Sequence, residues 1–150
     1  MKEGSYMATK EQIETLLEQL SKAPPSEHFQ NFDQNTVGIR AILKYLSETY
    51  EKVTAGKISE NIKVSSARVA VLLKKMEAKG LIKKEQDPAD GRIVIVELTE
   101  HGIQTAILIK ENLYDHLGKM IDKVGMERML EFAAISYEIH SVMQEQDFDV

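Results

Sequence analysis

The amino-acid sequence predicts a mainly α-helical protein with one small β-hairpin. Two observations indicate this fold class. Apolar residues recur every three or four positions over most of the chain, as they do on one face of a helix. Near the middle that period gives way to two short runs, 81–85 and 92–98, the second rich in Ile and Val, around the turn-forming stretch Asp-Pro-Ala-Asp-Gly. The expected order is therefore helices, a hairpin, and helices again.

The first two helices are expected at residues 9–21 and about 36–50. The apolar stripe of the first consists of Ile13, Leu16, Leu17 and Leu20. Ala-Pro-Pro at 23–25 ends this helix, because proline lacks a backbone N–H and restricts the residue before it. The candidate core residues of the second helix are Val37, Ile39, Ile42, Leu43 and Leu46.

Two shorter helices follow, and each begins at a residue suited to cap it. The first is TAGKISENI and the second, after the turn KVS, is SARVAVLLKKMEAKG. Thr54 and Ser65 can accept hydrogen bonds from the free N–H groups of a first helical turn. Gly80 suits the left-handed conformation that often ends a helix.

After the hairpin, Thr99 is expected to cap a long helix that continues to about residue 123. The apolar face of this helix consists of Ala106, Ile109, Leu113, Leu117 and Met120. Val124-Gly125 interrupts the pattern. A last helix carries Met126, Met129, Leu130, Ala133, Tyr137 and Met143. The expected parts of the chain are 9–35 (first helix and loop), 36–102 (the two short helices, the helix before them and the hairpin) and 103–145 (the last helices).

Positive charge is concentrated in the central segment. From Lys52 to Arg92 there are ten Lys or Arg against five Asp or Glu, a net charge of +5, whereas the whole chain carries −5. Helix, turn, helix and a basic hairpin form a winged helix-turn-helix order. Because a local basic patch, rather than the overall pI, is the electrostatic footprint of a nucleic-acid partner, this segment is predicted to face double-stranded DNA.

Several other functions lack support in the sequence. With no Cys, thiol catalysis, disulfides and cysteine zinc sites are excluded. The four His residues (28, 101, 116 and 140) show no metal-binding spacing, and no phosphate loop or catalytic motif is present, so we expect no enzyme, metal or cofactor. No apolar run approaches the ~18 residues of a membrane span. The expected location is the cytoplasm.

The second of the two short helices is the candidate DNA-reading helix. On a helical wheel Val69, Leu72, Leu73 and Met76 cluster on the side that must face the core. The opposite face is small, basic and partly apolar. Such a face fits a major groove, because an Arg can reach guanine O6 and N7 and an Ala or Val can touch a thymine methyl group. The alternative is an ordinary surface helix, or a Val71 that packs on a neighbouring helix.

The hairpin carries Asp90, Gly91 and Arg92. An Asp two residues before an Arg can fix the guanidinium by hydrogen bonds. A fixed Arg at a loop tip can enter a narrow minor groove, where the negative potential is highest. In isolation the triplet is typical of a routine surface turn, but after a helix-turn-helix it favours a DNA contact.

At this point the chain resembles a known family. The string KISENIKVSSARVAVLLKKMEAKGLIKKEQDPADGRIVIVELTEHG is similar to the winged helix of MarR-type (multiple antibiotic resistance regulator) transcription factors. The matching features are the capped helix after VS, the MEAKGLI junction, the D-x-R wing and the LTEHG exit. The resemblance covers about residues 36–102, and outside them it rests on the number and order of helices. It implies a homodimer that binds pseudo-palindromic DNA, most simply as a repressor, and often senses small phenolic ligands.

The resemblance also assigns residues by position. It places Ser65, Ser66, Arg68, Val71 and Lys75 on the DNA-facing helix and Arg92 in the wing. Two departures stand out: position 71 is often basic or polar in the family, and the reactive Cys of the peroxide-sensing branch is absent. The full set of expected DNA-contacting residues is Thr54, Lys57, Ser65, Ser66, Ala67, Arg68, Val71, Lys74, Lys75, Asp90 and Arg92.

A small-molecule effector and a second subunit are the further partners expected. The family keeps its ligand pocket between dimerisation helices and the winged domain, where the candidates here are His28, Phe29, Arg40 and Tyr45. The alternative is that these four are ordinary core and loop residues. The apolar faces of the N- and C-terminal helices predict a homodimer, because a small monomer cannot bury them alone. A rival function is a winged helix that contacts other proteins in a larger assembly.

Overall fold

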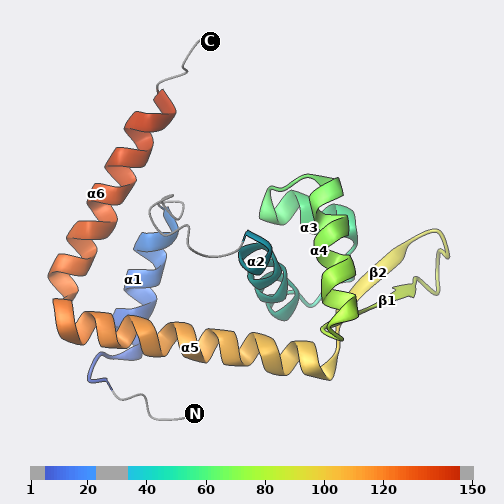
Figure 1. The fold of residues 1–150 in the computed structure, drawn as a ribbon, viewed down its shortest axis with the longest axis horizontal. Helices are drawn as coiled ribbons and strands as arrows, with labels where there is room; N and C mark the ends of the chain where they lie inside the picture. The colour runs from blue at the N-terminus through green and yellow to red at the C-terminus, as the bar shows by residue number, and fades with distance from the viewer. Residues whose placement is uncertain (1–5, 23–33, 146–150) are drawn as a thin grey trace. The chain divides into compact units, whose positions relative to one another are not determined.

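The computed structural model describes residues 6–22 and 34–145 of the chain (Figure 1). In chain order the elements are α1 (Lys10–Lys22), α2 (Gln34–Glu48), α3 (Ala55–Ile62), α4 (Ser66–Ala78), β1 (Ile82–Gln86), β2 (Val94–Leu98), α5 (Glu100–Val124) and α6 (Met126–Glu145). The mainly helical fold with one hairpin is confirmed. None of the helices described is both long enough and apolar enough to cross a membrane.

The chain divides into two units, which we call the terminal unit and the central unit. The terminal unit is Met1–Asn31 with Glu111–Val150, and the central unit is Phe32–Lys110. Helix α5 contributes residues to both. The units have separate hydrophobic cores, and each is described below on its own.

In the terminal unit, α1 packs against α6 and the last turns of α5. A reciprocal cap begins α1: Thr9 Oγ1 accepts from the Gln12 amide at 3.2 Å, and Gln12 Oε1 accepts from the Thr9 amide at 2.8 Å. The buried core consists of Ile13, Leu16, Leu117 and Ile121. Leu113 and Met120, expected on the same apolar face of α5, are nearly half exposed. The reason is that α5 packs against this core through the side of the helix that carries Leu117 and Ile121.

In the central unit, α2, α3 and α4 enclose one core with the hairpin. Its buried side chains are Ile42, Leu43, Leu46, Val53, Ile58, Val69, Leu72, Leu73, Met76, Leu81, Ile82 and Val96. Val37, expected in the core, is instead 48% exposed. Next to it, Gly38 lets α2 approach α4 closely, since a Cβ there would meet Leu72 Cδ1 at 2.7 Å.

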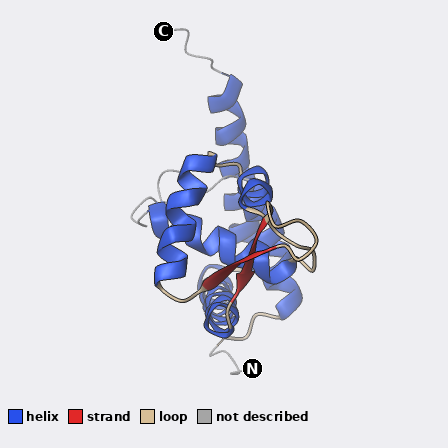
Figure 2. Ribbon diagram, turned by 90° about the vertical axis from the view of Figure 1, so that its right-hand side faces the viewer, coloured by secondary structure: helices blue, strands red, loops and turns tan. Residues whose placement is uncertain are grey.

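The hairpin is antiparallel, with Ile82 opposite Leu98 and Gln86 opposite Val94 (Figure 2, red strands). The strand β2 begins at Val94 and not at Arg92 as expected, because residues 87–93 form a turn closed by the bond from the Asp87 amide to the Ile93 carbonyl at 2.8 Å. The Val96 amide also donates to the Val53 carbonyl at 2.8 Å. The loop before α3 is thereby fixed to the hairpin.

The beginning of α5 is locked to the segment that follows α4. Thr99 caps α5, because its Oγ1 accepts from the Gly102 amide at 3.0 Å. The Thr99 amide in turn donates to the Leu81 carbonyl at 3.1 Å. Gly102 lies so close that a Cβ on it would be 2.0 Å from that carbonyl oxygen. Only glycine therefore fits at this crossing.

Candidate nucleic-acid interface

Helix α4 is held at both ends by backbone caps. At its start, Ser65 Oγ accepts from the Arg68 amide at 3.3 Å. At its end, Gly80 has a φ of +66°. The Gly80 amide donates to the Glu77 carbonyl and the Leu81 amide to the Met76 carbonyl, each at 2.9 Å, which is the Schellman arrangement. The caps expected at Ser65 and Gly80 are confirmed, and together they define the length of the helix.

The turn between α3 and α4 rests on one residue that the sequence did not single out. Lys63 has a φ of 54°, the only positive value at a non-glycine residue among those described. Ser59 stabilises the turn, because its carbonyl accepts from the amides of Lys63 and Val64 and its Oγ donates to the Val64 carbonyl at 2.6 Å. No glycine or asparagine marks this left-handed position, so it could not be predicted from the sequence.

The two faces of α4 differ as the wheel predicted. Val69, Leu72, Leu73 and Met76 are buried. On the opposite side Ala67, Val71, Lys74 and Lys75 are exposed and Arg68 is half-buried, and Ser66 at the start of the helix and the flanking Ala70 are also exposed. Within the part of the chain that the structure describes, no carboxylate pairs with Arg68, Lys74 or Lys75. The outward face of α4 therefore presents small side chains and unneutralised positive charge.

Two of the expected contact residues on α3 are engaged by the protein itself. Thr54 caps α3, accepting from the Lys57 amide at 3.3 Å. The Lys57 ammonium donates to Glu51 Oε2 at 3.3 Å and to the Lys52 carbonyl at 3.2 Å. The charge of Lys57 is thus shared with the loop before α3.

The wing loop is fixed at its base by an ion pair that the sequence analysis did not identify. Lys52 donates to both carboxylate oxygens of Asp87, at 3.0 and 3.1 Å. Asp87 Oδ1 also accepts from the Ala89 amide at 2.8 Å. The Ala89 hydrogen bond, followed by that of Lys52, lowers the pKa of Asp87 below 3.8. The one available signal was the Asp-Pro that opens the turn.

At the wing tip, Asp90 and Arg92 are in contact, as the D-x-R spacing predicted. Asp90 Oδ1 accepts from the Arg92 amide at 3.0 Å and from its Nε at 3.4 Å. The Arg92 side chain is 94% exposed and that of Asp90 45%. The backbone bond is the shorter of the two, so Asp90 shapes the loop as well as the guanidinium position.

The strands of the wing neutralise their own charge. Lys83 pairs with Glu85 at 2.7 Å and with Glu97 at 3.0 Å. The hydrogen bond that Lys83 donates to Glu85, followed by that to Glu97, raises the pKa of Lys83 above 10.5. Lys84 pairs with Glu77 at 2.9 Å. Glu97 lies outside the segment whose net charge is +5, so its pair with Lys83 offsets part of that charge. Arg68, Lys74 and Lys75 on α4 have no carboxylate partner among the described residues.

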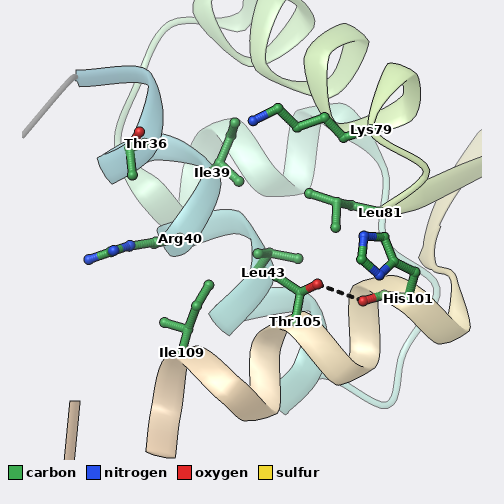
Figure 3. Close-up of a pocket in the computed structure, with 9 residues that line it drawn as sticks. All are labelled: Thr36, Ile39, Arg40, Leu43, Lys79, Leu81, His101, Thr105 and Ile109. Atoms are coloured by element: carbon green, nitrogen blue, oxygen red, sulfur yellow. Dashed lines mark hydrogen bonds between the residues drawn. The ribbon is translucent and has the colours of Figure 1, made fainter. Parts of the chain in front are cut away.

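A separate feature of the central unit is a cavity of about 550 Å³ between α2, the end of α4 and the beginning of α5 (Figure 3). Its apolar wall consists of Ile39, Leu43, Leu81 and Ile109. Its polar lining consists of Thr36, Arg40, Lys79, His101 and Thr105. Thr105 Oγ1 donates to the His101 carbonyl at 2.7 Å. The volume lies within the range of small-molecule sites.

Of the four expected ligand residues, one lines this cavity. Arg40 does so from α2, and in Figure 3 its guanidinium extends away from His101. Tyr45 is not among the lining residues and packs, half-buried, against the core of the central unit. His28 and Phe29 lie outside the described residues. Lys79, His101 and Thr105 were not anticipated. No group of three or more His, Asp or Glu side chains in the described residues is placed to hold a metal ion.

Helix α4 is preceded by α3 and a turn, and it is followed by an antiparallel hairpin with an arginine at its tip. This order of elements defines a winged helix-turn-helix protein. The sequence pattern of the MarR family matches residues 41–94, which span α2 to the beginning of β2. Over these residues the chain is similar to a family of transcriptional regulators.

Two curated relatives come from Bacillus subtilis (strain 168). The organic hydroperoxide resistance transcriptional regulator is 33% identical over 72 residues, which are 48% of this chain and 46% of the relative. The uncharacterized HTH-type transcriptional regulator YdgJ is 26% identical over 77 residues, 51% of this chain and 47% of the relative. The chain thus spans about half the length of the curated relatives it matches.

Solved structures match over more of the chain. A mutant of Lactococcus lactis ZitR in apo form is 27% identical, with a TM-score of 0.57 over 93% of this chain and 97% of the other. BldR from Sulfolobus solfataricus is 25% identical, with a TM-score of 0.51 over 89% and 86%. The S. aureus MepR–DNA complex, at 22% identity and a TM-score of 0.52 over 81% and 89%, shares the fold.

Proposed function

We propose that this protein is a sequence-specific DNA-binding transcriptional regulator that acts as a homodimer on a pseudo-palindromic operator. The observation that carries the proposal is the outward face of α4, where Arg68, Lys74 and Lys75 have no carboxylate partner among the described residues. The family match and the crystallised complex of MepR with DNA support it.

The proposed binding mode places α4 in a major groove. Its small exposed residues allow a close approach, Arg68 reaches base edges, and Lys74 and Lys75 lie near phosphates. Arg92 extends from the wing into the adjacent minor groove. The residues proposed to contact or position DNA remain Thr54, Lys57, Ser65, Ser66, Ala67, Arg68, Val71, Lys74, Lys75, Asp90 and Arg92. Occupying a promoter in this way represses transcription.

The dimer is proposed to form through α1, α5 and α6. The argument is the apolar surface that these helices leave exposed: Leu113, Met120, Phe132, Ile135, Tyr137, Ile139, Val142 and Met143 are each between 43% and 66% exposed. Burying such a surface in a partner is favourable. A twofold axis then sets two α4 helices about one DNA turn, ~34 Å, apart. Sedimentation at micromolar concentration is expected to show twice the 17.0 kDa chain mass; a single species of chain mass contradicts the dimer.

Control by a small aromatic acid is proposed at the cavity. Its apolar wall suits a ring, and the ammonium of Lys79 and a ring N–H of His101 can each donate to a carboxylate. If a ligand binds the DNA-free conformation of the protein more tightly than the DNA-bound conformation, it lowers the affinity of the protein for DNA. Millimolar salicylate is expected to raise the melting temperature and weaken DNA binding, and less so in His101→Ala. If salicylate changes neither quantity, the cavity is not an effector site.

The test of the central proposal is selection of bound DNA from a random pool. We expect a pseudo-palindrome whose half-sites are about one helical turn apart. Affinity for it should fall with a slope of roughly −5 to −8 in log affinity against log salt concentration, because several phosphates are neutralised. Failure to enrich any DNA, with retention of the protein on an acidic protein surface, favours the rival function of a protein-binding winged helix.

A further inference from the structure

We propose that Val71 reads the methyl group of a thymine in each half-site, so that one T·A pair of the operator is specified by an apolar contact. This inference rests on the proposed function, since it names what one residue of α4 recognises in DNA.

Val71 lies on the side of α4 opposite the core. A helix turns about 100° per residue, and the buried positions Val69, Leu73 and Met76 fall on the far side from Val71. Its side chain is 48% exposed, although valine is among the residues most often found inside proteins. About half of its apolar surface is therefore available to a partner.

The surroundings of Val71 indicate the kind of partner. By helical geometry Arg68 and Lys75 flank it on one side and Ala67 and Lys74 on the other. Of these, the alanine is too short to stand between Val71 and a groove. The cations favour a polyanion and disfavour an apolar protein surface, whose burial would strip them of water. An apolar tip within a ring of cations therefore fits DNA.

Chemistry narrows the target to one group. Valine can neither donate nor accept a hydrogen bond, so it cannot read the polar edge of a base. Among the groups that base pairs present in the major groove, the C5-methyl of thymine is the apolar one. A valine that faces the groove therefore favours a T·A pair. It disfavours any base pair that places a polar atom against it, because that atom would lose its hydrogen bond to water.

Deoxyuridine provides a direct test, because it pairs as thymine does and lacks only the methyl group. The operator recovered by selection is resynthesised with each thymine in turn replaced by deoxyuridine, symmetrically in both half-sites. At the thymine that Val71 contacts, we expect the substitution to weaken wild-type binding about fourfold per half-site, which is the loss of affinity expected when one buried methyl group is removed. In Val71→Ala the loss at that position is expected to vanish.

The variant and its control are well matched. Val71→Ala should fold, since the side chain is exposed and alanine is the better helix former. Val37→Ala removes the same atoms from α2 at a site that is also 48% exposed. The Val37 variant is expected to keep the full deoxyuridine effect.

The outcomes separate the inference from the proposed function. If selection enriches no DNA, the proposed function fails and the inference fails with it. If an operator is recovered but no deoxyuridine position weakens binding, or the loss persists in Val71→Ala, the inference alone is overturned. A loss that disappears in Val71→Ala and persists in Val37→Ala establishes the contact.

Discussion

Lys52 and Asp87 join the loop before α3 to the first residue of the wing loop. The ammonium donates to both carboxylate oxygens, at 3.0 and 3.1 Å, and the Asp87 side chain is only 11% exposed whereas that of Lys52 is 61% exposed. The hydrogen bond from the Val96 amide to the Val53 carbonyl connects the same loop to β2. The base of the wing is therefore fixed to the body of the central unit, while its tip extends freely.

The first prediction concerns the protonation of Asp87. Its pKa is lowered below 3.8, first by the Ala89 amide and then by Lys52. A lowered pKa means that the contribution to folding stability is present above pH 3.8 and lost as the pH falls through the folded value. In Lys52→Met, carboxyl NMR titration is expected to show that the pKa of Asp87 rises only part of the way toward 3.8, because the hydrogen bond from the Ala89 amide remains. Lys119→Met, which removes a charge paired with Asp115 in the terminal unit, should leave it unchanged.

The second prediction concerns the wing tip. Arg92→Ala should weaken DNA binding by about 1–3 kcal/mol per subunit contact without affecting folding, and more at A·T-rich than at G·C-rich flanks. Asp90→Ala should weaken binding too, although it deletes a negative charge. Asp90→Asn keeps an oxygen for the Arg92 amide and should retain more affinity than Asp90→Ala.

Equilibrium binding to the selected operator measures all three variants. If Asp90→Ala tightens binding while Arg92→Ala weakens it, Asp90 is only a surface charge. Wild-type affinity in both alanine variants would mean that the wing does not contact DNA.

The third prediction concerns the turn before α4. Lys63 has a φ of 54°, a conformation that costs a residue with a Cβ roughly 1–2 kcal/mol. Glycine avoids that cost, but it makes the unfolded chain more flexible, which offsets part of the gain. Lys63→Gly is therefore expected to raise the free energy of unfolding by about 0.5–1 kcal/mol in urea titrations. Lys63→Ala removes the same charge and keeps the strain. Equal unfolding free energies for the two variants would contradict this explanation.

The fourth prediction compares two glycines within helices. A Cβ at Gly102 would be 2.0 Å from the Leu81 carbonyl oxygen, a backbone atom that cannot move aside, so Gly102→Ala should destabilise the central unit by at least about 1–3 kcal/mol. At Gly56 a Cβ meets only Thr54 Oγ1 at 3.7 Å. Gly56→Ala should instead stabilise α3 by about 0.5–1 kcal/mol. Thermal unfolding that shifts in the same direction for both variants would contradict the close crossing.

The elements predicted best from the sequence are those fixed by local chemistry. Thr54, Ser65 and Thr99 begin helices because a hydroxyl can bond an amide three residues ahead, and Gly80 ends one because it adopts a positive φ readily. The D-x-R contact spans two residues for the same reason. Each of these features is complete within a few positions, so the sequence alone contains it.

The features that the sequence did not reveal depend on contacts between distant positions. Lys52 and Asp87 meet only once the hairpin has folded against the loop before α3. Which sides of α5 are buried depends on its neighbours, and Leu113 is exposed although its spacing matches that of buried Leu117. The charge count also overstated the basic surface, because Lys83 pairs with Glu97, which lies outside the counted segment and faces it across the hairpin.

The caps at both ends of α4 have a thermodynamic consequence for recognition. The first-turn amide of Arg68 and the last carbonyls of Met76 and Glu77 already have partners within the protein. The helix therefore needs no further folding when it meets a groove. Calorimetry of the association should accordingly give a small negative heat capacity change, of the size expected for the surface in contact, rather than the large change that accompanies folding coupled to binding.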